Sequence, residues 1–215
     1  AFEYGATIIA IDAGLMFQPA ALLTSTIRRS PESPATRLKT LSYIDNIFAA
    51  REAAARAIRR SGYDGAAVAD IMKDAGLTHG GFYAHFASRE AMLAEAADRA
   101  GAEALAASAR IAASAPSANA LRPLLQAYLS KEHVQDAENG CPVVALGSEM
   151  PRQGLAVRRA ATRRIKEMID LVARQSPDWG HPGAHEKALV TVATMVGALL
   201  LARAVDDPKL SDALR

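Results

Sequence analysis

The side chains best suited to chemistry in this chain lie in one window, from Gly62 to Leu93. A helical pattern over 66–75 ends at Gly76, and a tight turn then leads into a very short helical pattern over 78–85. A helix, a glycine turn and a short second helix are the parts of a helix-turn-helix. The second helix of such a unit enters the DNA major groove and presents its N-terminal residues to base edges. The window therefore predicts a unit that reads DNA.

The candidate DNA contacts in this window divide by the part of the duplex they should touch. Thr78, His79 and Gly80 begin the second helix, so we expect them to face the bases. Gly80 and its neighbour Gly81 carry no side chain and let the backbone approach DNA closely. Phosphate contacts are predicted for the polar residues that follow, namely Tyr83, His85, Ser88 and Arg89. Backbone N–H groups at a helix start and a guanidinium both favour a phosphate.

Apolar side chains should hold the second helix in place. A small core is predicted from Ile71, Leu77, Phe82, Phe86 and Leu93. Upstream, apolar residues repeat at helical spacing over 42–61, and Gly62 is a plausible stop. Downstream, a long helix capped by Ser88 is expected over 88–114. It contains no Pro/Gly-rich break, so it should leave the DNA-reading unit without a flexible linker.

Composition predicts an all-α protein. Of its 215 residues, 50% are apolar and 22% charged, and Gly and Pro fall mostly between alanine-rich stretches. The net charge of +2 is too small to give the whole protein an electrostatic field that would attract nucleic acid or membranes, so any basic surface must be local. The single cysteine, Cys141, excludes an intrachain disulfide and suits a cytoplasmic protein.

Three parts are predicted along the chain. Residues 1–34 should form a poorly ordered tail, which lacks the basic start of a secretory signal and ends in a proline-containing linker. Residues 35–97 should form a three-helix DNA-binding domain that contains the helix-turn-helix. Residues 98–215 should form a second helical domain, with further helices over 121–134, 143–150, 153–175 and 184–205.

The last of these helices is unusually apolar. Every residue from Ala188 to Ala202 is uncharged, yet the stretch is shorter than the roughly 20 apolar residues of a membrane span. A soluble helix of this kind must be covered nearly all round. Together with the helix over 153–175, it predicts a four-helix homodimer interface and no membrane association.

Two histidine pairs are candidate metal ligands. His79 with His85, and His181 with His185, are close in sequence, but no Cys/His/Asp cluster at zinc spacing accompanies either pair. Contact with DNA or solvent is the simpler explanation for these side chains. We therefore predict no metal and no cofactor.

Cys141, between Gly140 and Pro142, invites two interpretations. A constrained turn at a helix start could make it a redox or electrophile sensor. A small side chain packed in the core is the simpler alternative. With His133 and Glu149 it is also the only conceivable catalytic set, but nothing fixes their geometry, so no enzyme is predicted.

A basic run in the helix over 153–175 could be a second nucleic-acid surface, although such runs are usually the solvated face of a helix. Its members are Arg158, Arg159, Arg163, Arg164 and Lys166.

The window resembles the DNA-binding domain of the TetR/AcrR family of bacterial regulators over about 48–97. The most specific part is Ala-Gly-Leu-Thr-His-Gly-Gly-Phe-Tyr-Ala-His-Phe at 75–86, followed by Ser-Arg-Glu at 88–90. Two departures matter. Lysine is usual in the family where Arg89 stands, and Thr or Ser is usual near 66–67, where this chain has two alanines. The stretches 140–149 and 203–208 look like a subgroup of these regulators.

The resemblance implies a repressor whose C-terminal half forms the dimer and binds a small effector that releases it from a double-stranded DNA operator. An apolar or aromatic effector is expected. Its predicted pocket residues are Leu105, Leu125, Tyr128, Val144, Met168 and Trp179. The alternative is a helical small-molecule carrier or enzyme with a vestigial helix-turn-helix. Sequence-dependent binding to DNA that flanks its own gene would distinguish the two.

Overall fold

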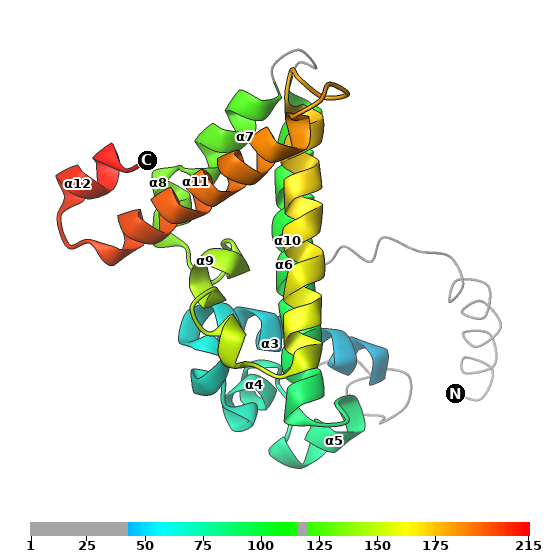
Figure 1. Cartoon of the computed structure of the whole chain (residues 1–215). Helices are drawn as coiled ribbons and strands as arrows, with labels where there is room; N and C mark the ends of the chain where they lie inside the picture. The colour runs from blue at the N-terminus through cyan, green and yellow to red at the C-terminus, as the bar shows by residue number, and fades with distance from the viewer. Residues whose placement is uncertain (1–42, 116–119) are drawn as a thin grey trace.

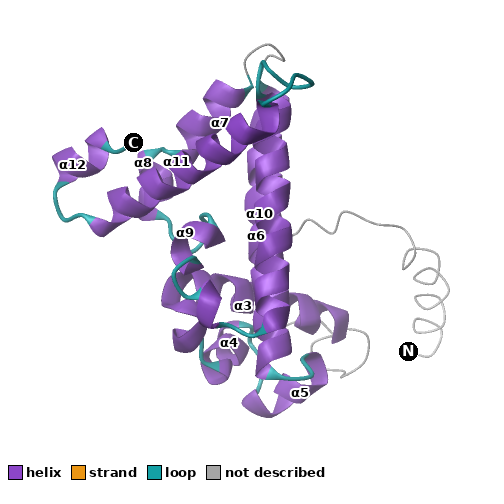
Figure 2. Ribbon diagram, viewed as in Figure 1, coloured by secondary structure: helices purple, strands orange, loops and turns teal. Residues whose placement is uncertain are grey.

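The computed structural model describes residues 43–115 and 120–215 (Figure 1). The predicted tail over 1–34 and the beginning of the predicted DNA-binding domain at 35–42 lie outside them. Every regular element in the described ranges is a helix (Figure 2), so the all-α prediction is confirmed.

The N-terminal helices follow the predicted order. They are α3 (Tyr43–Gly65), α4 (Val68–Asp74), the 3-10 turn η1 (His79–Gly81), α5 (Phe82–His85) and α6 (Arg89–Ser114). The stop predicted at Gly62 is visible as a kink, because this residue has φ 75° and ψ 175° inside the segment assigned to α3. Gly76 also has a positive φ, 70°, where the chain turns out of α4. Both conformations favour glycine.

The predicted core of the helix-turn-helix is confirmed. Phe82 and Phe86 are 4% and 2% exposed, with ring centroids 5.5 Å apart, and Leu77 packs against the same cluster. Ile71 and Leu93 are buried there too. Ala67 is the N-cap of α4 and supplies no side-chain bond to it.

The C-terminal helices are more divided than predicted. They are α7 (Leu121–Tyr128), α8 (Lys131–Gln135), α9 (Pro142–Leu146), η3 (Met150–Arg152), α10 (Leu155–Gln175), α11 (Ala184–Ala204) and α12 (Pro208–Ala213). The single helix expected over 121–134 breaks because the Ser130 hydroxyl accepts the His133 N–H and starts α8. Likewise, the Asp207 side chain caps α12, a helix the sequence analysis did not predict.

Two long helices form the axis of the molecule. In Figure 1, α6 and α10 run side by side, while α3, α4 and α5 surround one end of α6 and α7 and α11 cross near the other. A side chain at Gly101 of α6 would collide with Arg164 of α10. The Arg164 guanidinium instead makes two 2.8 Å bonds to Asp98 and one of 2.7 Å to Glu167. Close packing at Gly101 and the bidentate ion pair between Arg164 and Asp98 therefore join the two helices.

The helix α11 keeps an apolar face in solvent. It packs against α10, yet Val190 and Leu201 are 66% and 50% exposed. The uncharged stretch of this helix, from Ala188 to Ala202, was predicted to be too short to span a membrane. The whole helix has 21 residues and, by length and composition alone, could cross a membrane. Its first turn carries the charged residues Glu186 and Lys187.

Candidate functional site

The start of the second helix of the helix-turn-helix is open to solvent. Thr78 is the N-cap of η1 with φ −79° and ψ 147°, but its side chain makes no capping bond within the described structure. Thr78, His79 and Gly80 are all exposed. A Cβ added at Gly80 would meet no described atom within 4 Å, so the fold itself leaves room there. These three residues form an unobstructed surface at the position predicted to face bases.

The residues predicted to contact phosphate differ in how exposed they are and in which groups of the protein they contact. Tyr83 is 80% exposed, and Phe82 holds its ring edge-on with centroids 5.1 Å apart. His85 is half-buried, and burial lowers its pKa. The Ser88 hydroxyl caps α6 by accepting the Ala91 N–H at 3.0 Å, as predicted.

Arg89 has a structural partner that the sequence analysis missed. Its Nη2 donates to the carbonyl of Tyr63 at 2.6 Å, although the residue remains exposed. On the other side of the same residue, the Tyr63 N–H donates to a carboxylate oxygen of Glu149 at 2.8 Å. Arg89 and Glu149 thus fix the backbone directly after the Gly62 kink. The burial of Tyr63, and secondarily the charge of Glu149, raise the pKa of its hydroxyl to about 12.

A second arginine joins the DNA-binding helices to the C-terminal half. Arg59 of α3 has a side chain only 1% exposed. Its guanidinium donates to the Ala100 carbonyl of α6 at 2.7 Å and to the Glu103 carboxylate at 2.9 Å. It also donates to the Glu138 carbonyl at 3.1 Å, in the loop before α9. This buried cation therefore connects three separate segments.

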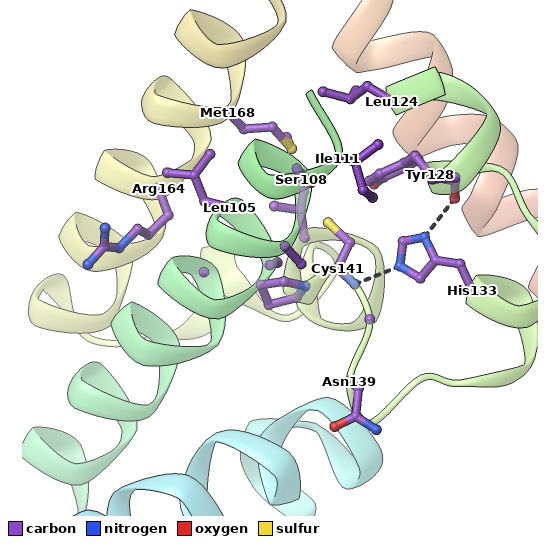
Figure 3. Close-up of a pocket in the computed structure, with 17 residues that line it drawn as sticks. Leu105, Ser108, Ile111, Leu124, Tyr128, His133, Asn139, Cys141, Arg164 and Met168 are labelled. Carbon is purple, nitrogen blue, oxygen red and sulfur yellow. Dashed lines mark hydrogen bonds between the residues drawn. The ribbon is translucent and has the colours of Figure 1, made fainter. Parts of the chain in front are cut away.

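A partly open cavity of about 190 Å³ begins where that loop ends (Figure 3). Its walls come from α6, α7, α10 and the 139–143 segment. Four of its apolar side chains are Leu105, Ile111, Leu124 and Met168. The polar groups at its margin include Ser108, Tyr128, His133 and Cys141.

The structure brings three of the six predicted effector residues to this cavity. Leu105, Tyr128 and Met168 line it. Leu125 follows Leu124 on α7 and faces a separate surface groove, since successive helical residues point about 100° apart. Val144 is buried in the neighbouring core, and Trp179 is 55% exposed in the loop between α10 and α11. These last three lie outside the cavity because periodicity alone does not show which face of a helix meets which neighbour.

Tyr128, His133 and Cys141 form a compact polar margin. The Nδ1 of His133 lies 2.6 Å from the Tyr128 carbonyl, and its Nε2 accepts the Cys141 N–H at 3.0 Å (Figure 3). A carbonyl only accepts, so Nδ1 carries the proton and the ring is neutral. The His133 and Tyr128 rings meet edge-on at 4.9 Å. Burial is the main reason that the pKa of His133 lies below its ordinary value of 6.5, and the positive charge of Arg203 also lowers it.

This neutral histidine predicts a pH-dependent stability. Because the folded chain holds the His133 pKa below its unfolded value, the unfolded chain binds more protons in acid. The contribution to stability is therefore present above about pH 6.5 and is lost as the pH falls through the folded-state pKa. His133→Gln keeps an acceptor oxygen and cannot become protonated. Denaturant unfolding at a series of pH values should give this variant the shallower acid decline.

His85 should contribute to the acid decline independently of His133, because burial lowers its pKa as well. Some acid sensitivity should therefore remain in His133→Gln. Equal declines in the wild type and in His133→Gln would contradict the assignment.

The alternative sites of the sequence analysis do not assemble. Glu149 bonds to the Tyr63 N–H, and both ring nitrogens of His133 bond to backbone groups, so neither residue activates the Cys141 thiol. Within 43–115 and 120–215, no three His, Cys, Asp or Glu side chains are placed to hold a metal ion. The basic run on α10 is partly structural, since Arg163 and Arg164 both pair with Asp98.

Two family descriptions match the chain. Residues 51–96 match the N-terminal domain of bacterial regulatory proteins of the tetR family. Residues 117–212 match the C-terminal domain of LmrA/YxaF-like transcriptional regulators. The first match covers the helix-turn-helix and the second runs from α7 into α12.

Individual relatives agree with these matches. An uncharacterized HTH-type transcriptional regulator of Mycobacterium tuberculosis strain H37Rv is 33% identical over 163 residues, which cover 70% of this chain and 80% of that protein. Among solved structures, NemR of E. coli in its reduced form shares 19% identity with a TM-score of 0.67, over 79% of this chain and 93% of that one. A TetR transcriptional regulator from Chloroflexus aurantiacus shares 24% with a TM-score of 0.67, over 80% and 91%. The chain belongs to the TetR family of DNA-binding transcriptional regulators.

Proposed function

We propose that this chain acts in the cytoplasm as a homodimeric repressor, which binds a near-palindromic operator and leaves it when a small molecule fills the cavity. The observation that carries the proposal is the open surface of Thr78, His79 and Gly80 at the start of the second helix. In a dimer, two such surfaces enter successive major grooves of the operator. Family membership does not favour the alternative of a carrier with a vestigial helix-turn-helix.

The test of DNA reading compares base-facing with backbone-facing variants by fluorescence anisotropy, using DNA that flanks the chain's own gene. Thr78→Ala and His79→Ala should change the preference among operator variants, because a base contact discriminates by about 1–3 kcal/mol. Tyr83→Ala should weaken binding to all sequences alike. Arg89→Ala should do the same and lower the salt slope by about one, because its guanidinium is expected to contact a phosphate.

A fold control is needed for Arg89, because it also holds the Tyr63 carbonyl. Thermal unfolding of each variant separates a lost DNA contact from a distorted turn. If all four variants keep operator affinity within about twofold, the assigned surface is wrong.

The exposed stripe on α11 supports the homodimer. Along this helix, Val190, Ala193, Leu201 and Ala204 are exposed at helical spacing, and a Cβ added at Gly197 would meet no described atom within 4 Å. An apolar stripe with a small residue at its centre suits close approach of a second helix. The exposed side of α10 is mostly charged, so in the proposed interface α11 supplies the apolar centre and α10 the polar rim.

Two connections could carry an effector's influence from the cavity to the DNA. The first is α6, a single helix from Arg89 to Ser114 that begins beside the helix-turn-helix and lines the cavity with Leu105. The second is the loop at Glu138, whose carbonyl is bound by Arg59 directly before the cavity-lining residue Asn139. A molecule that displaces either wall can tilt the second helix as part of a rigid unit.

A further inference from the structure

We infer that the cavity selects an uncharged, mostly apolar molecule about the size of one substituted aromatic ring, which accepts a hydrogen bond from the Tyr128 hydroxyl. This inference rests on the proposed effector function and adds the chemical class of the effector. Three properties of the cavity carry it: its volume, the state of its charged residues and the position of one buried hydroxyl.

The volume limits the size of the ligand. An apolar cavity of about 150 Å³ is enough to hold benzene. The cavity here measures about 190 Å³, which leaves room for one ring and a small substituent. Its aliphatic wall of Leu105, Ile111, Leu124 and Met168 favours an apolar surface on the ligand.

The charged and titratable residues at the margin argue against an ionic ligand. The Arg164 guanidinium is held by Asp98 and Glu167, and in Figure 3 it points away from the cavity. His133 is neutral, with both ring nitrogens bonded to backbone groups. The nearest other cation, Arg203, does not line the cavity and is bonded to the backbone carbonyls of the His133–Asp136 segment. A charged ligand would therefore lose its hydration without meeting an unpaired opposite charge among the lining residues. An uncharged ligand avoids that penalty.

The buried hydroxyl specifies the polar group of the ligand. Tyr128 is 7% exposed, and its ring extends from α7 toward Ile111 and Cys141 (Figure 3). Among the described residues, its hydroxyl has no partner at full hydrogen-bond geometry, and its one side-chain interaction is a weak one with the Cys141 thiol. Burial keeps the pKa of this phenol far above its usual range, so the group remains a donor. A thiol is a weak acceptor, and a carbonyl oxygen on the ligand would be a much better one.

Three probes of similar size separate these properties. Acetophenone offers one ring and a carbonyl oxygen, isopropylbenzene has nearly the same shape without an acceptor, and benzoate adds a charge. Calorimetric titration of the full chain should rank acetophenone first, isopropylbenzene second and benzoate last. Tyr128→Phe, which removes only the hydroxyl, should weaken acetophenone by about threefold to tenfold, the range expected for one neutral hydrogen bond. Binding of isopropylbenzene should stay within about twofold or improve.

The chain supplies a matched control in Tyr63, another buried tyrosine whose hydroxyl has no hydrogen-bond partner among the described residues. Its hydroxyl lies outside the cavity, so Tyr63→Phe should leave all three titrations unchanged. Equal affinities for acetophenone and isopropylbenzene, or the same loss in both tyrosine variants, would overturn recognition by Tyr128. Tighter binding of benzoate would overturn the inference of an uncharged ligand.

Operator binding, measured in parallel, keeps this inference separate from the proposed function. If the chain binds an operator and other compounds release it while acetophenone does not bind, the ligand class is wrong and the effector function stands. If no operator is bound in any ligand state, the proposed function is wrong whatever the titrations show.

Discussion

Replacing both Val190 and Leu201 by glutamate is expected to leave the chain monomeric and to weaken its operator binding by about a hundredfold or more. These side chains are 66% and 50% exposed on α11 and lie on one stripe of the helix. Carboxylates there would have to be buried unpaired against the same stripe of a second copy, which opposes association. A monomer then engages one half-site at a time and loses the gain from two linked contacts.

Light scattering at micromolar concentration checks the first half of this prediction. The wild type should scatter as a particle of about 45 kDa, twice the 22.7 kDa chain, and the double variant as one chain. Leu210→Glu is the matched control, since Leu210 is 47% exposed on α12 and lies outside the stripe. A monomeric wild type, or a double variant that remains dimeric, would disprove the assignment of α11 to the interface.

The parts of the fold that depend on neighbouring residues were predicted well. The kink at Gly62 and the continuous helix from Ser88 follow from backbone chemistry and periodicity, which act within a few residues. The same local rules place Thr78, His79 and Gly80 in solvent at a helix start. The match to the TetR family then supports the proposal that this surface contacts DNA.

The cavity could be predicted only in part, because it is built by tertiary packing. Tyr128 and Met168 lie on predicted inward faces and do line it. Periodicity alone does not show that the chain breaks at Ser130 and starts α8, which brings the His133 ring against Tyr128. A Ser three residues before His133 is a capping signal that could have revealed the break.

Arg59 was missed altogether, and its loss should affect both stability and regulation. Its side chain is buried among apolar residues of α3, so the helical pattern gave no reason to expect a charge with distant partners. Arg59→Met keeps the unbranched stem and removes every donor. The free energy of unfolding should fall by about 2–3 kcal/mol. This is less than the loss of a fully buried ion pair, because Glu103 is 39% exposed and keeps a 2.8 Å bond from Arg99.

Arg60→Met is the matched control for that measurement. Arg60 is next in sequence and faces Asp74 and Glu138 at 3.4 and 3.5 Å, but its side chain is 46% exposed. Exposed pairs of this kind contribute about 0–1 kcal/mol. Urea unfolding should therefore rank the wild type and Arg60→Met together, well above Arg59→Met.

The regulatory effect of Arg59→Met follows from its bond to the Glu138 carbonyl beside the cavity. Without that bond, a ligand can still fill the cavity, but a displacement of the loop at Glu138 is no longer transmitted to α3. The ratio of operator affinities with and without a releasing compound should move toward one, while direct titration shows that the compound still binds. By thermodynamic reciprocity, operator DNA should also lose its influence on the compound's affinity. If the variant keeps the full wild-type ratio, α6 alone carries the coupling.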